Sequence, residues 1–142
     1  MNSPTIRQIL FPTDYSDASR AAGQLAAELA RHFNAKLHVV HVVPPVTDPG
    51  PAGAMASAVA ELGPGVDFVT TVVLGRIAAQ IVSYAGRHDI DMIVMGTRGR
   101  TSVSRAVLGS VAAAVVRRAS CPVLTVPEST KSLSVPDDAP GA

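Results

Sequence analysis

Two kinds of apolar pattern alternate along the chain. Short apolar runs lie at 6–12, 37–43, 67–74, 91–95 and 122–126, and they predict strands. Between them, apolar residues recur every three or four positions in 18–33 and 76–88, which predicts helices, and the apolar segment 110–120 predicts a third. The alternation predicts an α/β fold: a five-stranded parallel sheet, doubly wound, with helices on both faces.

The same spacing predicts which helix faces are buried. For the first helix the face is Ala18, Ala22, Leu25, Leu29 and Phe33, with Ser16 or Asp17 as the N-cap. For 76–88 the face comprises Ile77, Ile81, Tyr84 and Ala85. Segment 110–120 is apolar enough to predict a buried helix.

Two segments depart from this pattern. Residues 44–65 are rich in proline and glycine and predict a long connection with one short helix around Ala54–Leu62. Residues 128–142 contain two prolines, three serines and two adjacent aspartates, which predicts a disordered tail. We therefore expect one domain at 1–127, followed by a tail at 128–142.

Composition narrows the class of protein. The chain has 142 residues, 47% of them hydrophobic and 16% charged, which is typical of a compact globular domain. Its formal charge of +1 predicts no strong attraction to nucleic acid or an anionic membrane. The single cysteine, Cys121, leaves no internal disulfide to form, and no signal-peptide core or membrane-length apolar run occurs. These features predict a cytoplasmic protein.

Charge is unevenly placed. Between Met92 and Pro127 there are five arginines and no acidic residue, and the stretch GTRGRTSVSRAVLGS (96–110) carries three of them. Ligands of doubly wound sheets bind at the carboxyl ends of strands, where the strand order reverses. This rule selects the loops that follow Phe11, Val43 and Met95. Glycines after a strand, followed by a helix that starts at Ser110, predict a site for phosphate.

Two well-known phosphate loops do not match this stretch. The Walker A motif requires a lysine, and none occurs between Lys36 and Lys131. The dinucleotide motif G-x-G-x-x-G also fails, because two and nine residues separate the successive glycines. A phosphate site in this chain must therefore be of another kind.

The spacing Gly96-x-x-Gly99, nine residues, then Gly109-Ser110 resembles the nucleotide-binding signature of the universal stress protein family. The stretches ILFPTDYS (9–16), VVHVV (39–43), DMIVMGTRGRT and CPVLTVP are similar to other elements of that family. The resemblance covers about four-fifths of the chain. It implies an adenine nucleotide α-hydrolase-like fold with strand order 3-2-1-4-5, and it implies ATP as the ligand.

The resemblance also implies roles for individual residues. The implied nucleotide-binding positions are Pro12, Thr13 and Asp14 at the adenosine, Val42 on the adenine, Met95 closing the pocket, Gly96, Thr97, Arg98 and Gly99 on the phosphate and ribose side, and Gly109, Ser110 and Val111 presenting helix-start N–H groups to the phosphates. Asp14 is the implied polar or metal-facing anchor, with Mg²⁺ or Mn²⁺ as candidate metals. Pairing of the last strand, Val123–Val126, implies a homodimer.

At several positions the alternative to a functional role is an ordinary structural one. Asp14 can serve as a turn or capping residue, and Arg98 can be a solvated loop charge. His38 and His41 are three apart on a strand, so they point to opposite faces, which argues against a metal cluster. Cys121 reads as a small core residue rather than a nucleophile.

We expect a nucleotide-dependent regulatory or sensor protein of the stress response. Phosphoryl transfer needs charge stabilisation and a positioned base, and the site offers no motif lysine and only one carboxylate. Efficient catalysis is therefore not expected, while slow ATP hydrolysis or autophosphorylation stays open. The alternatives are a dimeric stress scaffold that uses no nucleotide, and an enzyme that uses ATP to activate a second substrate.

Overall fold

The structure is a computed structural model that describes residues 5–48, 50–98 and 108–130. Its elements are, in chain order, β1 (Gln8–Pro12), α1 (Asp17–Phe33), β2 (Lys36–Val43), α2 (Ala54–Ala60), β3 (Asp67–Leu74), α3 (Ile77–Arg87), β4 (Met92–Gly96), α4 (Ser110–Arg118) and β5 (Val123–Val126). Every strand and helix predicted from the apolar pattern is present, within a few residues of the predicted bounds.

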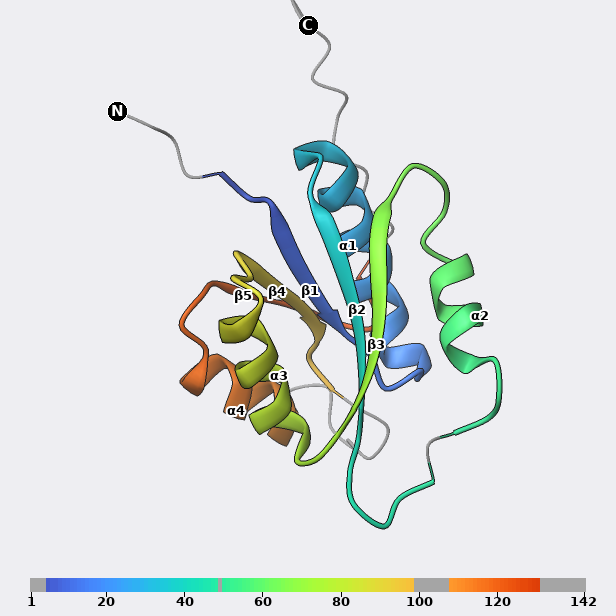
Figure 1. Cartoon of the computed structure of the whole chain (residues 1–142), viewed down its shortest axis with the longest axis vertical. Coiled ribbons are helices and arrows are strands. Elements are labelled where there is room, and N and C mark those ends of the chain that lie inside the picture. The colour runs from blue at the N-terminus through green and yellow to red at the C-terminus, as the bar shows by residue number, and fades with distance from the viewer. Residues whose placement is uncertain (1–4, 49, 99–107, 131–142) are drawn as a thin grey trace, which may run out of the picture.

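The five strands form one parallel sheet in the order β3-β2-β1-β4-β5 (Figure 1). This is the order that the resemblance implied. From β1 the chain moves outward to β2 and β3, and then returns to place β4 on the other side of β1. The reversal lies between β1 and β4, so the loops after these two strands diverge and leave a crevice between them.

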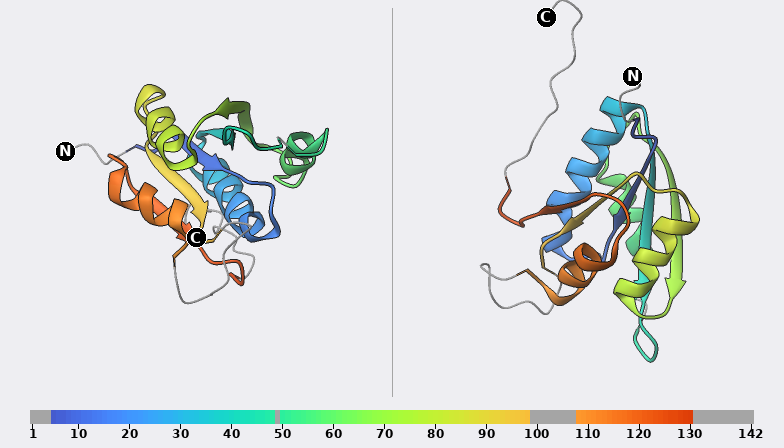
Figure 2. Two further views of the ribbon diagram at one scale, coloured as in Figure 1. Left: turned by 90° about the horizontal axis from the view of Figure 1, so that it is seen from below. Right: turned by 90° about the vertical axis from the view of Figure 1, so that its left-hand side faces the viewer.

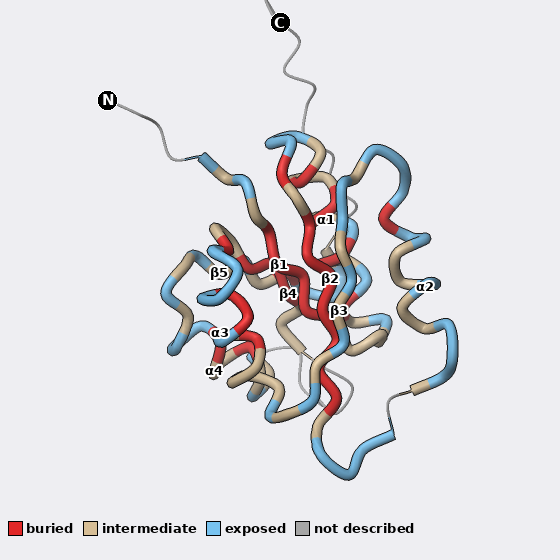
Figure 3. The backbone as a smooth tube through the Cα atoms, viewed as in Figure 1, coloured by how far each residue is buried: buried red, intermediate tan, exposed pale blue. Residues whose placement is uncertain are grey.

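Helices cover the sheet on both faces (Figure 2). On one face, α1 packs over Ile9, Phe11 and Val39, and Met55 and Val59 of α2 join this cluster at its border. On the other face, α3 and α4 pack over a second cluster; its members from the sheet are Leu10, Val40, Val42, Ile93 and Met95. The most deeply buried stretches are the central strands (Figure 3). In β2 every residue after Lys36 is buried, as its near-continuous apolar run predicted.

The buried face of α1 differs from the prediction. The residues that face the sheet are small: Ser19, Ala22, Gly23, Ala26, Ala27 and Ala30. Leu25 and Leu29 are only partly buried, and Phe33 is 42% exposed. Small side chains let the helix axis approach the sheet closely, which shifts the large apolar residues to the flank of the contact.

Helix α4 is less buried than the sequence predicted. Only Ala112 and Val115 are buried in this helix, and Val116 is 47% exposed. The helix contacts α3 and β5 along one side. Its opposite side faces outward, because none of the described elements lies over it (Figure 1).

The predicted domain boundary and tail are only partly described. Glu128 to Thr130 follow β5, whereas the rest of the predicted tail, from 131, lies outside the described residues. None of the helices in the described part of the chain combines the length and hydrophobicity that a membrane crossing requires.

Candidate functional site

The turn after β1 is held by β2. The Thr13 N–H donates to the Val40 carbonyl (2.9 Å), and His41 Nδ1 donates to the Thr13 carbonyl (2.7 Å). The hydroxyl of Ser19 donates to the Ser16 carbonyl, which leaves its oxygen to accept from the Thr13 hydroxyl at 3.1 Å. This chain of hydrogen bonds fixes where the backbone leaves the sheet.

The next residues of this turn use their side chains within the loop. Asp14 Oδ1 accepts from the backbone N–H of Ser16 (2.9 Å) and from the Ser16 hydroxyl. Ser16 occupies the N-cap position of α1, as predicted, but its hydroxyl is turned to Asp14 instead of capping the helix. Tyr15 has a left-handed backbone (φ 65°) and stacks on His41 with ring centroids 4.0 Å apart. Burial raises the pKa of the Tyr15 hydroxyl.

The end of β4 lies against the start of α1. A Cβ placed on Gly96 would lie 3.1 Å from the Ala18 carbonyl oxygen, a tight contact, so the close approach of the two elements favours glycine. Beyond it, the Thr97 carbonyl accepts a 2.6 Å hydrogen bond from the Gly109 N–H. That bond ties the residue before α4 to the end of β4 and places the helix start beside the crevice.

Helix α4 begins without a side-chain cap. Gly109 is its N-cap, with no side-chain hydrogen bond and no acidic residue in the first turn. The Gly109 carbonyl accepts from Ala113 (2.9 Å), whereas the N–H groups of Ser110, Val111 and Ala112 have no acceptor within the helix. These donors and the positive end of the helix dipole make the α4 start a site suited to an anion.

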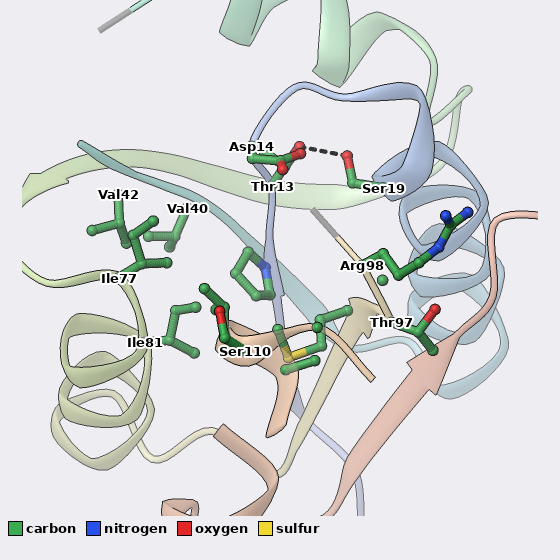
Figure 4. A pocket seen from close by; sticks show the side chains of 16 residues that line it. Thr13, Asp14, Ser19, Val40, Val42, Ile77, Ile81, Thr97, Arg98 and Ser110 are labelled. Carbon is green, nitrogen blue, oxygen red and sulfur yellow. Dashed lines mark hydrogen bonds between the residues drawn. The ribbon is translucent and has the colours of Figure 1, made fainter. Parts of the chain in front are cut away.

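These elements surround one cavity of about 120 Å³, which we call the crevice cavity (Figure 4). Its walls are Pro12, Thr13, Asp14, Ser19, Val40, Val42, Ile77, Ile81, Met95, Gly96, Thr97, Arg98, Gly109, Ser110, Val111 and Ala112. The fold thus brings eleven of the twelve predicted nucleotide-binding residues to one place. The twelfth, Gly99, lies outside the described residues.

Five lining residues were not predicted: Ser19, Val40, Ile77, Ile81 and Ala112. Val40 lies two residues before Val42, so the alternation of a strand could have placed it on the same face. The periodic face of 76–88 included Ile77 and Ile81, but it indicated only burial. Ser19 carried no signal, because its position depends on how α1 approaches β4.

The crevice cavity has two chemically different ends. Val40, Val42 and Ile77 lie at one end and Thr97 and Arg98 at the other, whereas Ser110 lies between them, beside Ile81 (Figure 4). Among the described lining residues, the ionisable side chains are Asp14 and Arg98. Such a cavity can enclose a flat apolar group at one end and face an anionic group at the other.

Arg98 is paired at the rim of the cavity. Its Nη2 donates to Oε2 of Glu128, which follows β5. The Arg98 side chain is 14% exposed and that of Glu128 is 43% exposed. The guanidinium therefore has an anionic partner from the chain itself.

The histidines face different surroundings, as their spacing predicted. His38 contacts the Tyr84 hydroxyl through Nδ1 (2.7 Å) and Gln8 Oε1 through Nε2 (2.7 Å). His41 lies on the other face of the sheet, against Tyr15. In the described part of the chain, no group of three His, Cys, Asp or Glu residues could hold a metal ion.

Cys121 lies away from the cavity and is partly buried. Burial, with a smaller contribution from Asp91, raises the pKa of its thiol. A thiol with a raised pKa is protonated at neutral pH and is a poor nucleophile.

A second cavity, of about 330 Å³, lies between α1 and α2. It shares Thr13 and Ser19 with the crevice cavity, and its other lining residues are different. The charged residues on its wall, Arg20 and Glu61, pair with each other (Nε to Oε2, 3.0 Å). Helix α1, which starts on its wall, has the acidic Asp17 in its first turn, whereas the start of α4 on the wall of the crevice cavity has no acidic residue, which favours the crevice cavity as the site for an anionic ligand.

Comparison with known proteins gives consistent matches. The model of the universal stress protein family matches residues 5–127. A universal stress protein of Methanocaldococcus jannaschii is 34% identical, over 88% of this chain and 84% of its own. One of Thermus aquaticus is 36% identical, over 84% of this chain and 98% of its own. Among solved structures, a universal stress protein in complex with cAMP is 28% identical, covers 89% of this chain and 100% of its own, and has a TM-score of 0.70.

Proposed function

Because the chain belongs to the universal stress protein family, we propose that its crevice cavity binds ATP and that the protein is a nucleotide-dependent regulator or sensor of the stress response. The adenine would lie on Val40 and Val42, and the phosphates would face the start of α4. Gly99, which the sequence assigns to the phosphate side, completes the proposed set with the eleven lining residues.

The observation that carries the proposal is the uncapped start of α4 on the wall of the crevice cavity. We call this part of the wall the phosphate end. Three backbone N–H groups and the Ser110 hydroxyl converge there, and phosphate accepts hydrogen bonds from all of them. The apolar residues at the other end match the flat faces of adenine. The relative that was solved in complex with cAMP supports an adenine nucleotide as the class of ligand.

A divalent cation, Mg²⁺ or Mn²⁺, would enter with the nucleotide. Mg²⁺ is typically bound in proteins by one or two carboxylates together with phosphate oxygens and water. Asp14 supplies a carboxylate on the cavity wall and fits this requirement. The cation would neutralise phosphate charge, and Asp14 would orient it.

The described lining supports holding a nucleotide rather than turning it over. In-line attack on a phosphate needs a group that positions the nucleophile, and electrostatic stabilisation of the transferred group. Here the Asp14 carboxylate accepts a hydrogen bond from Ser16, and Arg98 forms an ion pair with Glu128, so both charged groups of the lining already have partners in the chain. Slow hydrolysis or autophosphorylation is the second candidate, and release of ADP over hours would reveal it.

Replacement of Gly109 by valine tests the proposal. Gly109 has φ −61° and ψ 157°, which valine adopts without strain, so the fold should be retained. The added side chain would fill the phosphate end of the cavity. Overpacking of this kind costs about 1–3 kcal/mol, so ATP should bind about fivefold to 150-fold more weakly in calorimetric titration. Adenosine, which has no phosphate, should be affected less.

Gly86→Val is the matched control. Gly86 lies in α3 with open space around it and does not line the cavity, so this variant should bind ATP like the wild type. Failure of ATP to bind the wild type, or equal affinity in a folded Gly109→Val protein, would sink the proposal.

We also propose a cytoplasmic homodimer. Strand β5 is one edge of the sheet, and its Leu124 is 38% exposed, which supports pairing with a second copy. The single cysteine is consistent with a reducing compartment. A monomer mass in sedimentation equilibrium at high protein concentration would refute the dimer.

A further inference from the structure

We infer that Glu128 is a specificity-determining residue of the crevice cavity. It holds Arg98 away from the phosphate end and so weakens the binding of phosphate-bearing ligands relative to adenosine. This inference rests on the proposed nucleotide site. It concerns the choice among ligands at that site rather than the existence of the site.

The pairing of β4 with β5 puts the two residues together. Gly96 is in register with Val126, and the Thr97 N–H donates to the Val126 carbonyl at 3.2 Å. Arg98 and Glu128 each lie two residues beyond this pair, where the strands have ended. The pairing of β4 with β5 therefore brings Arg98 and Glu128 close together.

The guanidinium points away from the interior of the cavity. Arg98 lines the cavity wall, but its side chain extends away from Val42 and Ser110 (Figure 4). At its far end Nη2 meets the Glu128 carboxylate. Rotation about the side-chain bonds of Arg98 would swing the guanidinium over the phosphate end, but only after Glu128 is released.

Phosphate and carboxylate compete for the same donors. Both are anions that accept charge-assisted hydrogen bonds from a guanidinium, and arginine binds either through two parallel N–H groups. A ligand with phosphates must displace Glu128 to recruit Arg98, whereas adenosine needs no such displacement. Glu128 therefore lowers the affinity for ATP and leaves the affinity for adenosine unchanged.

The pair can be opened by a ligand. Because the Glu128 side chain is 43% exposed, water solvates its carboxylate and screens the attraction. Pairs of this kind add little to stability, so we expect the gain in affinity on their removal to be about twofold to fivefold. Glu128 lies one residue beyond the segment matched by the family model, 5–127.

The test is a double-variant cycle measured by calorimetric titration with ATP, AMP and adenosine. Glu128→Gln keeps the shape of the side chain and removes its charge. It should raise the affinity for ATP about twofold to fivefold and leave that for adenosine unchanged. In an Arg98→Gln background the same change should give little or no gain, because no guanidinium remains to be released.

Glu61→Gln is the matched control, since Glu61 also pairs with an arginine but lies outside the crevice cavity. Its ATP-to-adenosine affinity ratio should equal that of the wild type. An unchanged ratio in Glu128→Gln, or an equal gain with and without Arg98, overturns the inference while the nucleotide site stands. If neither ATP nor adenosine binds the wild type, the proposed function fails and the inference fails with it.

Discussion

Three glycines show how one residue type meets different requirements. Gly96 allows β4 to approach the start of α1, and Gly109 begins α4 without a side chain at the cavity. The motif spacing selected both of them from the sequence. Gly23 has a tighter contact than Gly96, because a Cβ there would lie 2.8 Å from the Phe11 ring, but no spacing identified it. Its role depends on which face of α1 meets the sheet, and the large apolar residues of α1 indicated a different face.

Gly23→Ala should destabilise the protein although alanine favours helix. The Phe11 ring is 3% exposed and must shift to admit the new methyl group, and overpacking of this kind costs about 1–3 kcal/mol. Gly86→Ala is the matched control in a helix, with open space at the new Cβ. Gly86→Ala should raise the free energy of unfolding by up to about 1 kcal/mol. Urea unfolding measures both, and a Gly23→Ala protein at least as stable as the wild type would contradict the packing described for α1.

At the scale of elements, periodicity predicted where the helices and strands lie, but it did not predict the contacts between them. Strand β2 is a nearly continuous apolar run that contains His38 and His41, and its pattern predicted only that they point to opposite faces. In the fold, His38 of β2 meets Tyr84 of α3 and Gln8 of β1, with His88 5.7 Å away between ring centroids. Contacts between separate elements depend on register and helix rotation, which a pattern within one element does not carry.

This contact predicts a pH dependence of stability. Burial, then His88 and Lys36, lower the pKa of His38, so the folded state binds fewer protons than the unfolded state. The contribution of neutral His38 to the stability of the fold is complete above its ordinary pKa of about 6.5. It is lost as the pH falls from there toward the lowered pKa. The thermal midpoint should therefore drop between about pH 7.5 and about pH 5.5, and less so in His38→Gln.

His32→Gln serves as the control, because His32 is exposed at the end of α1. It should retain the pH dependence of the wild type. An equally steep fall in His38→Gln would assign the acid sensitivity to other groups.

At the scale of the whole molecule, the site is a product of topology. Residues from β1, β2, β4, α3 and α4 converge because the strand order reverses between β1 and β4. The alternating pattern predicted a parallel sheet, and the motif selected the loops, so most of the cavity could be predicted. The Arg98–Glu128 pair could not, because Glu128 lay in a segment that composition assigned to a disordered tail.

The most direct test is an NMR titration of backbone amides with ATP. If the phosphates meet the start of α4, the largest shifts should occur at Ser110, Val111 and Thr97, with a second group near Val42 on β2. The amides of α2, which line the second cavity, should stay unchanged. Shifts confined to the region between α1 and α2, or no shifts at saturating ATP, would contradict the proposal that this protein holds the nucleotide in the crevice cavity.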